Sequence, residues 1–209
     1  ILKELLQIRS KRKKPFFDDK TQLDLNCLWI SSLILASDIL PEKGYLNLAE
    51  EFFSKIEIRY LNTNIYHSYS KKNVFIEDYA FLINTLNDLS DRTMNFKYKD
   101  LARRITTEAI DKFFLIEKNI FQKNPKNNND VFLKPIDISD NTIPNGNAIM
   151  LINFIRLGMM DEAKKLSESL NGYLNNYKNH MMTSLRAVDY YNNIKSGKNC
   201  NEQGCKIDV

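Results

Sequence analysis

The residues of this sequence best suited to chemistry are carboxylates that stand where apolar helices are expected to begin. Glu77 and Asp78 are adjacent, and Asp140 shortly precedes a later helix. Consecutive helical positions project about 100° apart, so one carboxylate of the pair can cap the helix while the other faces a ligand. A carboxylate removed from water there can act as a general acid or base. We therefore predict Glu77, Asp78 and Asp140 as catalytic candidates, with structural capping as the competing interpretation.

Other polar side chains near the same helix starts are candidates for ligand binding. They comprise a short acidic and basic motif, an amide one turn inside the first apolar helix, a tyrosine beside the carboxylate pair, and a Pro-Asn-Gly-Asn turn. A helix cap, a turn or a surface ion pair would explain most of them, whereas Asn26, an amide among apolar neighbours, needs a partner and could orient a ligand or join two helices. Their expected convergence at one place is what favours a function. The candidates are Asp18, Asp19, Lys20, Asn26, Tyr79, Asn145 and Asn147.

Apolar residues recur with helical periodicity along nearly the whole chain, and two kinds of helix alternate. One kind is apolar around most of its circumference, which is typical of a helix buried on several sides. The other carries its apolar residues on a single stripe. We expect inner helices at 22–40, 77–89, 147–157 and 180–194, outer helices at 45–60, 98–114 and 161–174, and short hairpins or loops at 64–74 and 119–134.

This alternation predicts an all-α fold, a partial α/α toroid whose parallel inner helices begin at one end and form a polar mouth. A helical-repeat solenoid is the main rival, but no internal repeat is visible. Residues 1–196 supply helices for about half a ring, and 197–209 form a polar tail with two cysteines. A half ring leaves apolar surface exposed to water, which costs a free energy of about 25 cal/mol per Å². Upstream sequence or a partner chain is therefore expected to cover this surface.

Composition and charge argue against several classes of protein. The chain is 43% hydrophobic and 27% charged, which is an ordinary globular mixture. No stretch approaches the roughly 18 apolar residues of a membrane span, and the basic run at 9–14 is interpreted as a solvated helix end, not a nucleic-acid site. Neither a membrane nor a nucleic-acid partner is expected. Because the chain opens on Ile1, we expect a segment of a longer, cytoplasmic protein.

The histidines and cysteines do not predict a metal or redox centre. His67 and His180 are the two histidines, and no arrangement of His, Cys and Asp has metal-ligand spacing, so no metal or cofactor is predicted. Cys27 is expected to be a small buried apolar residue. Cys200 and Cys205 enclose four residues in the tail, where either a disulfide or a pair of free thiols fits.

The same motifs, in the same order, resemble the carboxy-terminal region of the spermatogenesis-associated protein 20 family. The members of this family are large thioredoxin-domain proteins. The resemblance runs almost end to end, with departures at Leu25 and Asn145, where the family has Trp and Ser. The matching residues are Arg9, Arg12, Pro15, Asp18-Asp19-Lys20, Asn26, Ile76 to Leu82, Lys134-Pro135, Asp140, Ile143 to Asn147, Cys200 and Cys205.

The resemblance implies an upstream thioredoxin-like domain, absent from this segment, followed by a six-hairpin α/α toroid related to sugar epimerases and glycosidases. Those epimerases use barrel histidines, and neither His67 nor His180 is expected at such a position. The predicted function is binding of a carbohydrate-like small molecule at the mouth, and an enzyme of this kind would be isomerase-, epimerase- or glycosidase-like. A non-catalytic scaffold for the thioredoxin module or a protein partner, and a helical-repeat adaptor with an open groove, are the alternatives.

Overall fold

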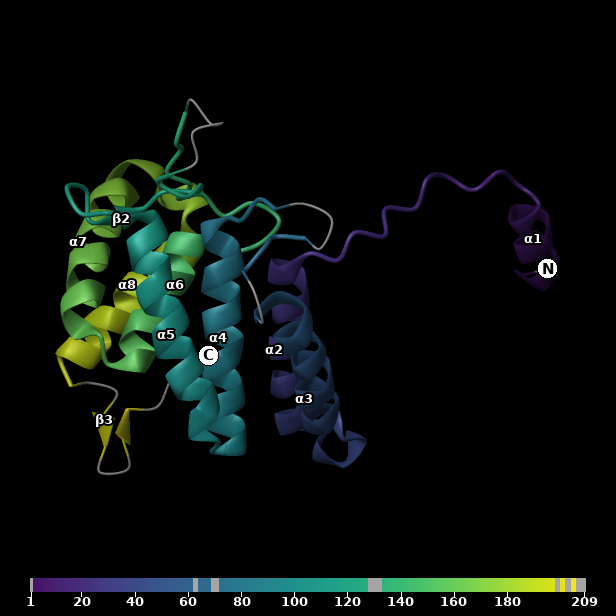
Figure 1. The fold of residues 1–209 in the computed structure, drawn as a ribbon, viewed down its shortest axis with the longest axis horizontal. Helices are drawn as coiled ribbons and strands as arrows, with labels where there is room; N and C mark the ends of the chain where they lie inside the picture. The colour runs from purple at the N-terminus through teal and green to yellow at the C-terminus, as the bar shows by residue number, and fades with distance from the viewer. Residues whose placement is uncertain are drawn as a thin grey trace.

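The computed structural model describes residues 2–61, 64–68, 72–127, 133–197, 200–201 and 204–205. Its helices form an inner and an outer layer (Figure 1). The inner helices are α2 (Leu23–Ile39), α4 (Ile76–Thr93), α6 (Gly146–Leu157) and α8 (Met182–Lys195). The outer helices are α3 (Tyr45–Ile56), α5 (Phe96–Phe113) and α7 (Met160–Tyr177). Short helical turns follow α2, α3 and α7, namely η1 (Pro41–Lys43), η2 (Glu57–Leu61, π-helical) and η3 (Lys178–His180).

The layers pack in the order that a toroid requires. α2 packs against α4, α4 against α6, and α6 against α8, while each of the first three inner helices also contacts the outer helix that follows it. The inner helices α4 and α6 are buried around most of their circumference, whereas α5 buries one stripe that includes Ala102, Ile105 and Ala109. The predicted alternation of inner and outer helices is therefore confirmed, with helix ends shifted by a few residues.

Helix α2 departs from its prediction because one of its faces is exposed. Leu33 and Ile34 are buried against α3 and α4, but Leu25, Trp29 and Leu35 lie open to solvent. The reason is position: α2 is the first inner helix of the described ring, so α3 and α4 cover one side of it. The apolar character that suggested burial on several sides instead marks the open edge of a partial ring.

The segment before α2 stands apart from the helical layers. α1 (Leu2–Ser10) lies away from the other helices at the end of an extended stretch (Figure 1), and residues 2–20 are all exposed. The basic run at 9–14 is thus solvated, as predicted. None of the helices in the described ranges is long and apolar enough to cross a membrane.

Two antiparallel hairpins accompany the helices. β1 (Phe114–Leu115) pairs with β2 (Ile120–Phe121), slightly earlier than the hairpin or loop expected at 119–134, of which residues 128–132 lie outside the described ranges. In the tail, β3 (Cys200–Asn201) pairs with β4 (Gly204–Cys205). In the loop before α4, Ser68 forms an isolated β-bridge with Gln22 at the start of α2. Cys27 is buried, as predicted.

The exposed face of α2 gives a first prediction. Leu33→Ala should lower the free energy of unfolding by about 2–5 kcal/mol, because it opens a cavity in the core. Leu35→Ala, the same change two residues along, should cost about 0.5 kcal/mol or less, since Leu35 is 55% exposed and Leu33 only 5%. Urea unfolding of both variants measures the difference. Equal losses would show that α2 is covered on both sides.

Candidate functional site

The site begins with the cap of α4. The residue before this helix is Phe75, which has no side-chain oxygen to cap with, so Asp78 caps from inside the first turn: its Oδ2 accepts a hydrogen bond from the Phe75 N–H at 2.9 Å. The other oxygen, Oδ1, lies 2.9 Å from Nδ1 of His67. Asp78 is completely buried, so both contacts replace the water that a carboxylate would otherwise bind.

His67 connects this cap to the start of α2. Its carbonyl accepts a hydrogen bond from the Leu23 N–H at 2.9 Å, and its Nε2 lies 3.1 Å from the side-chain nitrogen of Gln22. Asp24, in the first turn of α2, places its Oδ1 at 3.9 Å from Nδ1 of the same ring. Residues far apart in the sequence therefore meet around a single imidazole.

The environment shifts the ionisation of this group. The hydrogen bond with Asp78 raises the pKa of His67, because the carboxylate stabilises the charged ring. Burial raises the pKa of Asp24, and the nearby Asp78 adds to that shift by charge repulsion. Two buried carboxylates thus share one imidazole.

Glu77 is held between the starts of α4 and α6. It is buried, and its pKa is raised mainly by that burial. Its Oε2 has no hydrogen-bond partner among the residues that the structure describes. A buried acceptor left in this state carries a desolvation penalty of roughly 1–3 kcal/mol. An unsatisfied group of this kind requires an explanation, and a bound ligand would provide one.

Gly146 brings the two helix starts together. A Cβ at this position would lie 3.0 Å from Ile76 Cγ2 and 3.4 Å from the Glu77 backbone nitrogen. The glycine of the Pro-Asn-Gly-Asn turn therefore permits a close approach of the backbone to the first turn of α4.

A lysine and an aspartate complete the charged groups. Lys123 follows β2, and its Nζ donates to Asp137 Oδ2 at 2.9 Å. Burial opposes the charge on Lys123, but Asp137 and Glu77 raise its pKa overall. The Lys123 carbonyl also accepts a hydrogen bond from the Ile76 N–H, so this segment is anchored to the first residue of α4.

These groups surround a cavity of about 420 Å³ at the starts of α2, α4 and α6. This volume lies within the usual range for small-molecule sites. Most of its lining residues are polar. They are Gln22, Asp24, Leu25, His67, Phe75, Glu77, Lys123, Asp137, Ser139, Asn141, Thr142, Ile143, Pro144 and Asn145.

The structure brings some of the predicted catalytic residues to this cavity. Glu77 lines it, and Asp78 stands behind His67. Asp140 instead connects helix starts: it accepts hydrogen bonds from the backbone and side chain of Asn145 and from the Thr183 N–H near the start of α8. Its carboxylate is used for capping, which was the competing interpretation.

The asparagines of the turn are also engaged by the protein. Asn145 caps α6 by accepting from the Ala148 N–H, although it lines the cavity as well. Asn147 is fully buried and bonds to both backbone groups of Phe121, which attaches β2 to α6.

The remaining predicted ligand-binding residues lie outside the cavity lining in the described part of the chain. Asp18, Asp19 and Lys20 are exposed, and Lys20 pairs with Asp18 at 2.9 Å. Asn26 donates to the Gln22 carbonyl at 2.6 Å. Tyr79 is fully buried and its hydroxyl donates to Glu108 on α5, so its ring is not exposed to a ligand.

Sequence reasoning missed Gln22, Asp24, His67, Lys123 and Asp137. His67 reaches the site because a loop folds back between two helix starts and carries the ring to Asp78. Asp24, a charged residue in the first turn of an apolar helix, was a visible hint. His180 is exposed, as expected of a residue outside the site.

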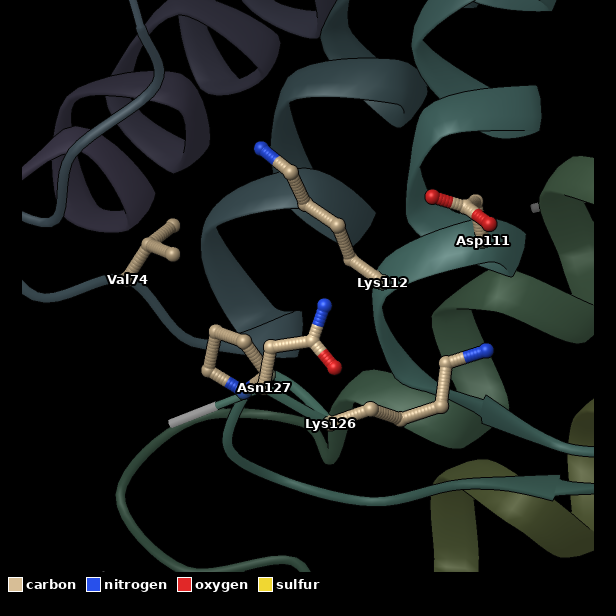
Figure 2. Close-up of a pocket in the computed structure, with 6 residues that line it drawn as sticks. Val74, Asp111, Lys112, Lys126 and Asn127 are labelled. Carbon is tan, nitrogen blue, oxygen red and sulfur yellow. The ribbon is translucent and has the colours of Figure 1, made fainter. Parts of the chain in front are cut away.

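A second cavity of about 410 Å³ lies where the end of α5 meets the segment after β2. Figure 2 shows the side chains of Asp111, Lys112, Lys126 and Asn127 around it. Lys112 already donates to Glu108 and to the Tyr79 hydroxyl. Glu77 lines the first cavity, and its unpartnered Oε2 makes that cavity the stronger candidate.

Comparisons with known proteins agree with this architecture. The chain is similar in structure to cellobiose 2-epimerase from Bacillus thermoamylovorans, with a TM-score of 0.55 and 17% identity over 72% of this chain and 44% of that one. The fold class is therefore an α/α toroid. In sequence, the chain is 29% identical over 183 residues to an uncharacterized protein of Caenorhabditis elegans. The alignment covers 81% of this chain and 25% of the relative. No family model matches the chain.

The contact at Gly146 gives a second prediction. Gly146→Ala should lower the free energy of unfolding by about 1–3 kcal/mol, because the added methyl group overpacks against Ile76 and Glu77. Gly172→Ala on α7 is the matched control, since a Cβ there meets no atom within 4 Å. It should raise stability by about 0.5–1 kcal/mol through helix propensity. Thermal unfolding distinguishes the two, and equal shifts would contradict the close approach.

Proposed function

We propose that this chain forms part of an α/α toroid domain that binds a carbohydrate-like, polyhydroxylated ligand in the cavity at the starts of α2, α4 and α6. The observation that carries the proposal is Glu77, a buried residue that lines this cavity and whose Oε2 has no hydrogen-bond partner in the described residues. A ligand hydroxyl would supply the missing donor. Hydroxyl groups both donate and accept, which suits a cavity that offers groups of both kinds.

The other charged and polar groups support the same ligand class. Asp24 and Asp137 present acceptors, Lys123 presents a donor, and Asn145 lies at the rim formed by the turn before α6. An anionic ligand would meet three carboxylates here for one lysine, which disfavours phosphate-rich molecules. A neutral polyol fits the charge of the cavity better.

Among the three predicted catalytic carboxylates, Glu77 is the one positioned to touch a ligand. Asp78 is engaged by Phe75 and His67, and Asp140 by Asn145 and Thr183. The neighbouring epimerase contributes a likeness of fold, and a shared fold does not carry a reaction with it. The proposal therefore assigns binding to the cavity and names no reaction.

We also propose, on the motif resemblance, that this chain is a carboxy-terminal region of the spermatogenesis-associated protein 20 family with a thioredoxin-like domain upstream. The chain spans about a quarter of the curated relative it matches, so that relative carries much additional sequence.

A scaffold role is the second candidate, and the exposed face of α2 favours it. Leu25, Trp29 and Leu35 would be covered by further helices of the ring or by a protein partner. Trp is among the residues enriched in protein interfaces.

Thermal shift with cellobiose, glucose, mannose and N-acetylglucosamine as probes tests the binding proposal. At ten times Kd a ligand should stabilise the protein by about 1.4 kcal/mol, a shift of roughly 3–6 °C for a domain of this size. Glu77→Gln should abolish the shift. The substitution replaces one carboxylate oxygen by an amide nitrogen, so an acceptor becomes a donor at this position.

Glu51→Gln is the matched control, because Glu51 is an exposed residue of α3 outside the cavity lining in the described ranges. The Glu51→Gln variant should show the same ligand-induced thermal shift as the wild type. If none of the probe sugars stabilises the wild type, or if Glu77→Gln responds as the wild type does, the binding proposal fails and the scaffold role is favoured.

A further inference from the structure

We propose that Asp24, His67 and Asp78 form a binding site for a divalent transition-metal ion. One ligand atom from each residue lies within 4.8 Å of the other two. The three residues come from the first turn of α2, the loop before α4, and the first turn of α4. Imidazole combined with carboxylate is a donor set suited to zinc and manganese.

The measured spacing fits a metal placed between the three groups. His67 Nδ1 lies 2.9 Å from Asp78 Oδ1 and 3.9 Å from Asp24 Oδ1. Ligands bound to zinc at about 2.0–2.1 Å lie about 3.3 Å from one another in a tetrahedral arrangement. The two observed distances bracket this value, so small rotations of the Asp24 and His67 side chains would close the site.

The charge of the site also calls for a cation. Asp24, Asp78 and Glu77 are all at least nine-tenths buried, while Lys123, the lysine that lines the cavity, already pairs with Asp137. Buried charges are normally paired or coordinate a metal. Glu77 lines the same cavity, and its Oε2, unpartnered within the described residues, is an independent sign of a missing positive or donating group.

Gln22 supplies the outer support that a metal-binding histidine requires. When Nδ1 binds a metal, Nε2 carries the ring proton and needs an acceptor. The side-chain amide of Gln22 lies 3.1 Å from Nε2. Flipping this amide by about 180° places its oxygen, an acceptor, where its nitrogen now lies, and the two orientations have nearly the same shape.

The competing interpretation is that His67 and Asp78 form only a structural hydrogen bond. That contact requires nothing of Asp24, whose Oδ1 is too far from the ring for a hydrogen bond and accepts instead from the Leu25 N–H at 2.8 Å. Asp24 therefore distinguishes a metal site from a structural pair. The inference does not rest on the proposed sugar ligand, because the probe is the metal ion alone.

Isothermal titration of the EDTA-treated, dialysed chain with zinc chloride, and separately with manganese chloride, tests the site. We expect one ion per chain for at least one of the two metals. Asp24→Asn should weaken binding at least tenfold while keeping the bond to Leu25, and His67→Gln should weaken it to a similar extent. Asp19→Asn makes the same change of charge at an exposed position and should bind as the wild type does.

Circular dichroism of each variant establishes that it is folded before titration. Absence of stoichiometric binding of both metals to the wild type would overturn the site. Unchanged affinity in either Asp24→Asn or His67→Gln would remove that residue from the ligand set and overturn the three-residue arrangement. Equal weakening in Asp19→Asn would show that surface charge, and not the site, controls binding.

Discussion

The buried carboxylate of Asp78 is the interaction on which the site depends. A carboxylate with no exposure to water must find donors within the protein, and Asp78 finds one in the Phe75 N–H and one in the His67 ring. The first contact starts α4. The second contact fixes the loop that precedes α4. The His67 carbonyl of this loop accepts a hydrogen bond from the N–H of Leu23, the first residue of α2. One side chain therefore ties together two inner helix starts that are more than fifty residues apart.

Similar short-range contacts join the remaining helix starts. Gly146 lets α6 approach the first turn of α4, and Asp140 links the caps of α6 and α8. Because the inner helices are parallel, these joints all lie at one end of the ring, where unpaired backbone N–H groups and helix dipoles also gather. Glu77 is buried by its neighbours at these helix starts and lines the cavity that they leave.

The sequence was sufficient for the fold because the two kinds of apolar pattern are local. Burial all round α4 and a single stripe on α5 follow directly from residue spacing. The site was harder, because its members are brought together by irregular segments whose paths have no periodicity. His67 and Lys123 occupy such segments, so only Glu77, Asp78 and Asn145 were foreseen there. Asp140 and Asn147 make caps and cross-links within the protein, which a sequence cannot distinguish from ligand contacts because capping and ligand binding use the same residue types.

The proton between His67 and Asp78 tests this account most directly. A carboxylate accepts hydrogen bonds, so the contact with Asp78 predicts a His67 ring whose Nδ1 carries a proton. Nitrogen-detected NMR of the metal-free protein should show Nδ1 of His67 carrying a protected, downfield proton that Asp78→Asn removes. A His67 ring that carries its proton on Nε2 alone, or exchanges freely with water, would contradict the contact that joins the starts of α2 and α4.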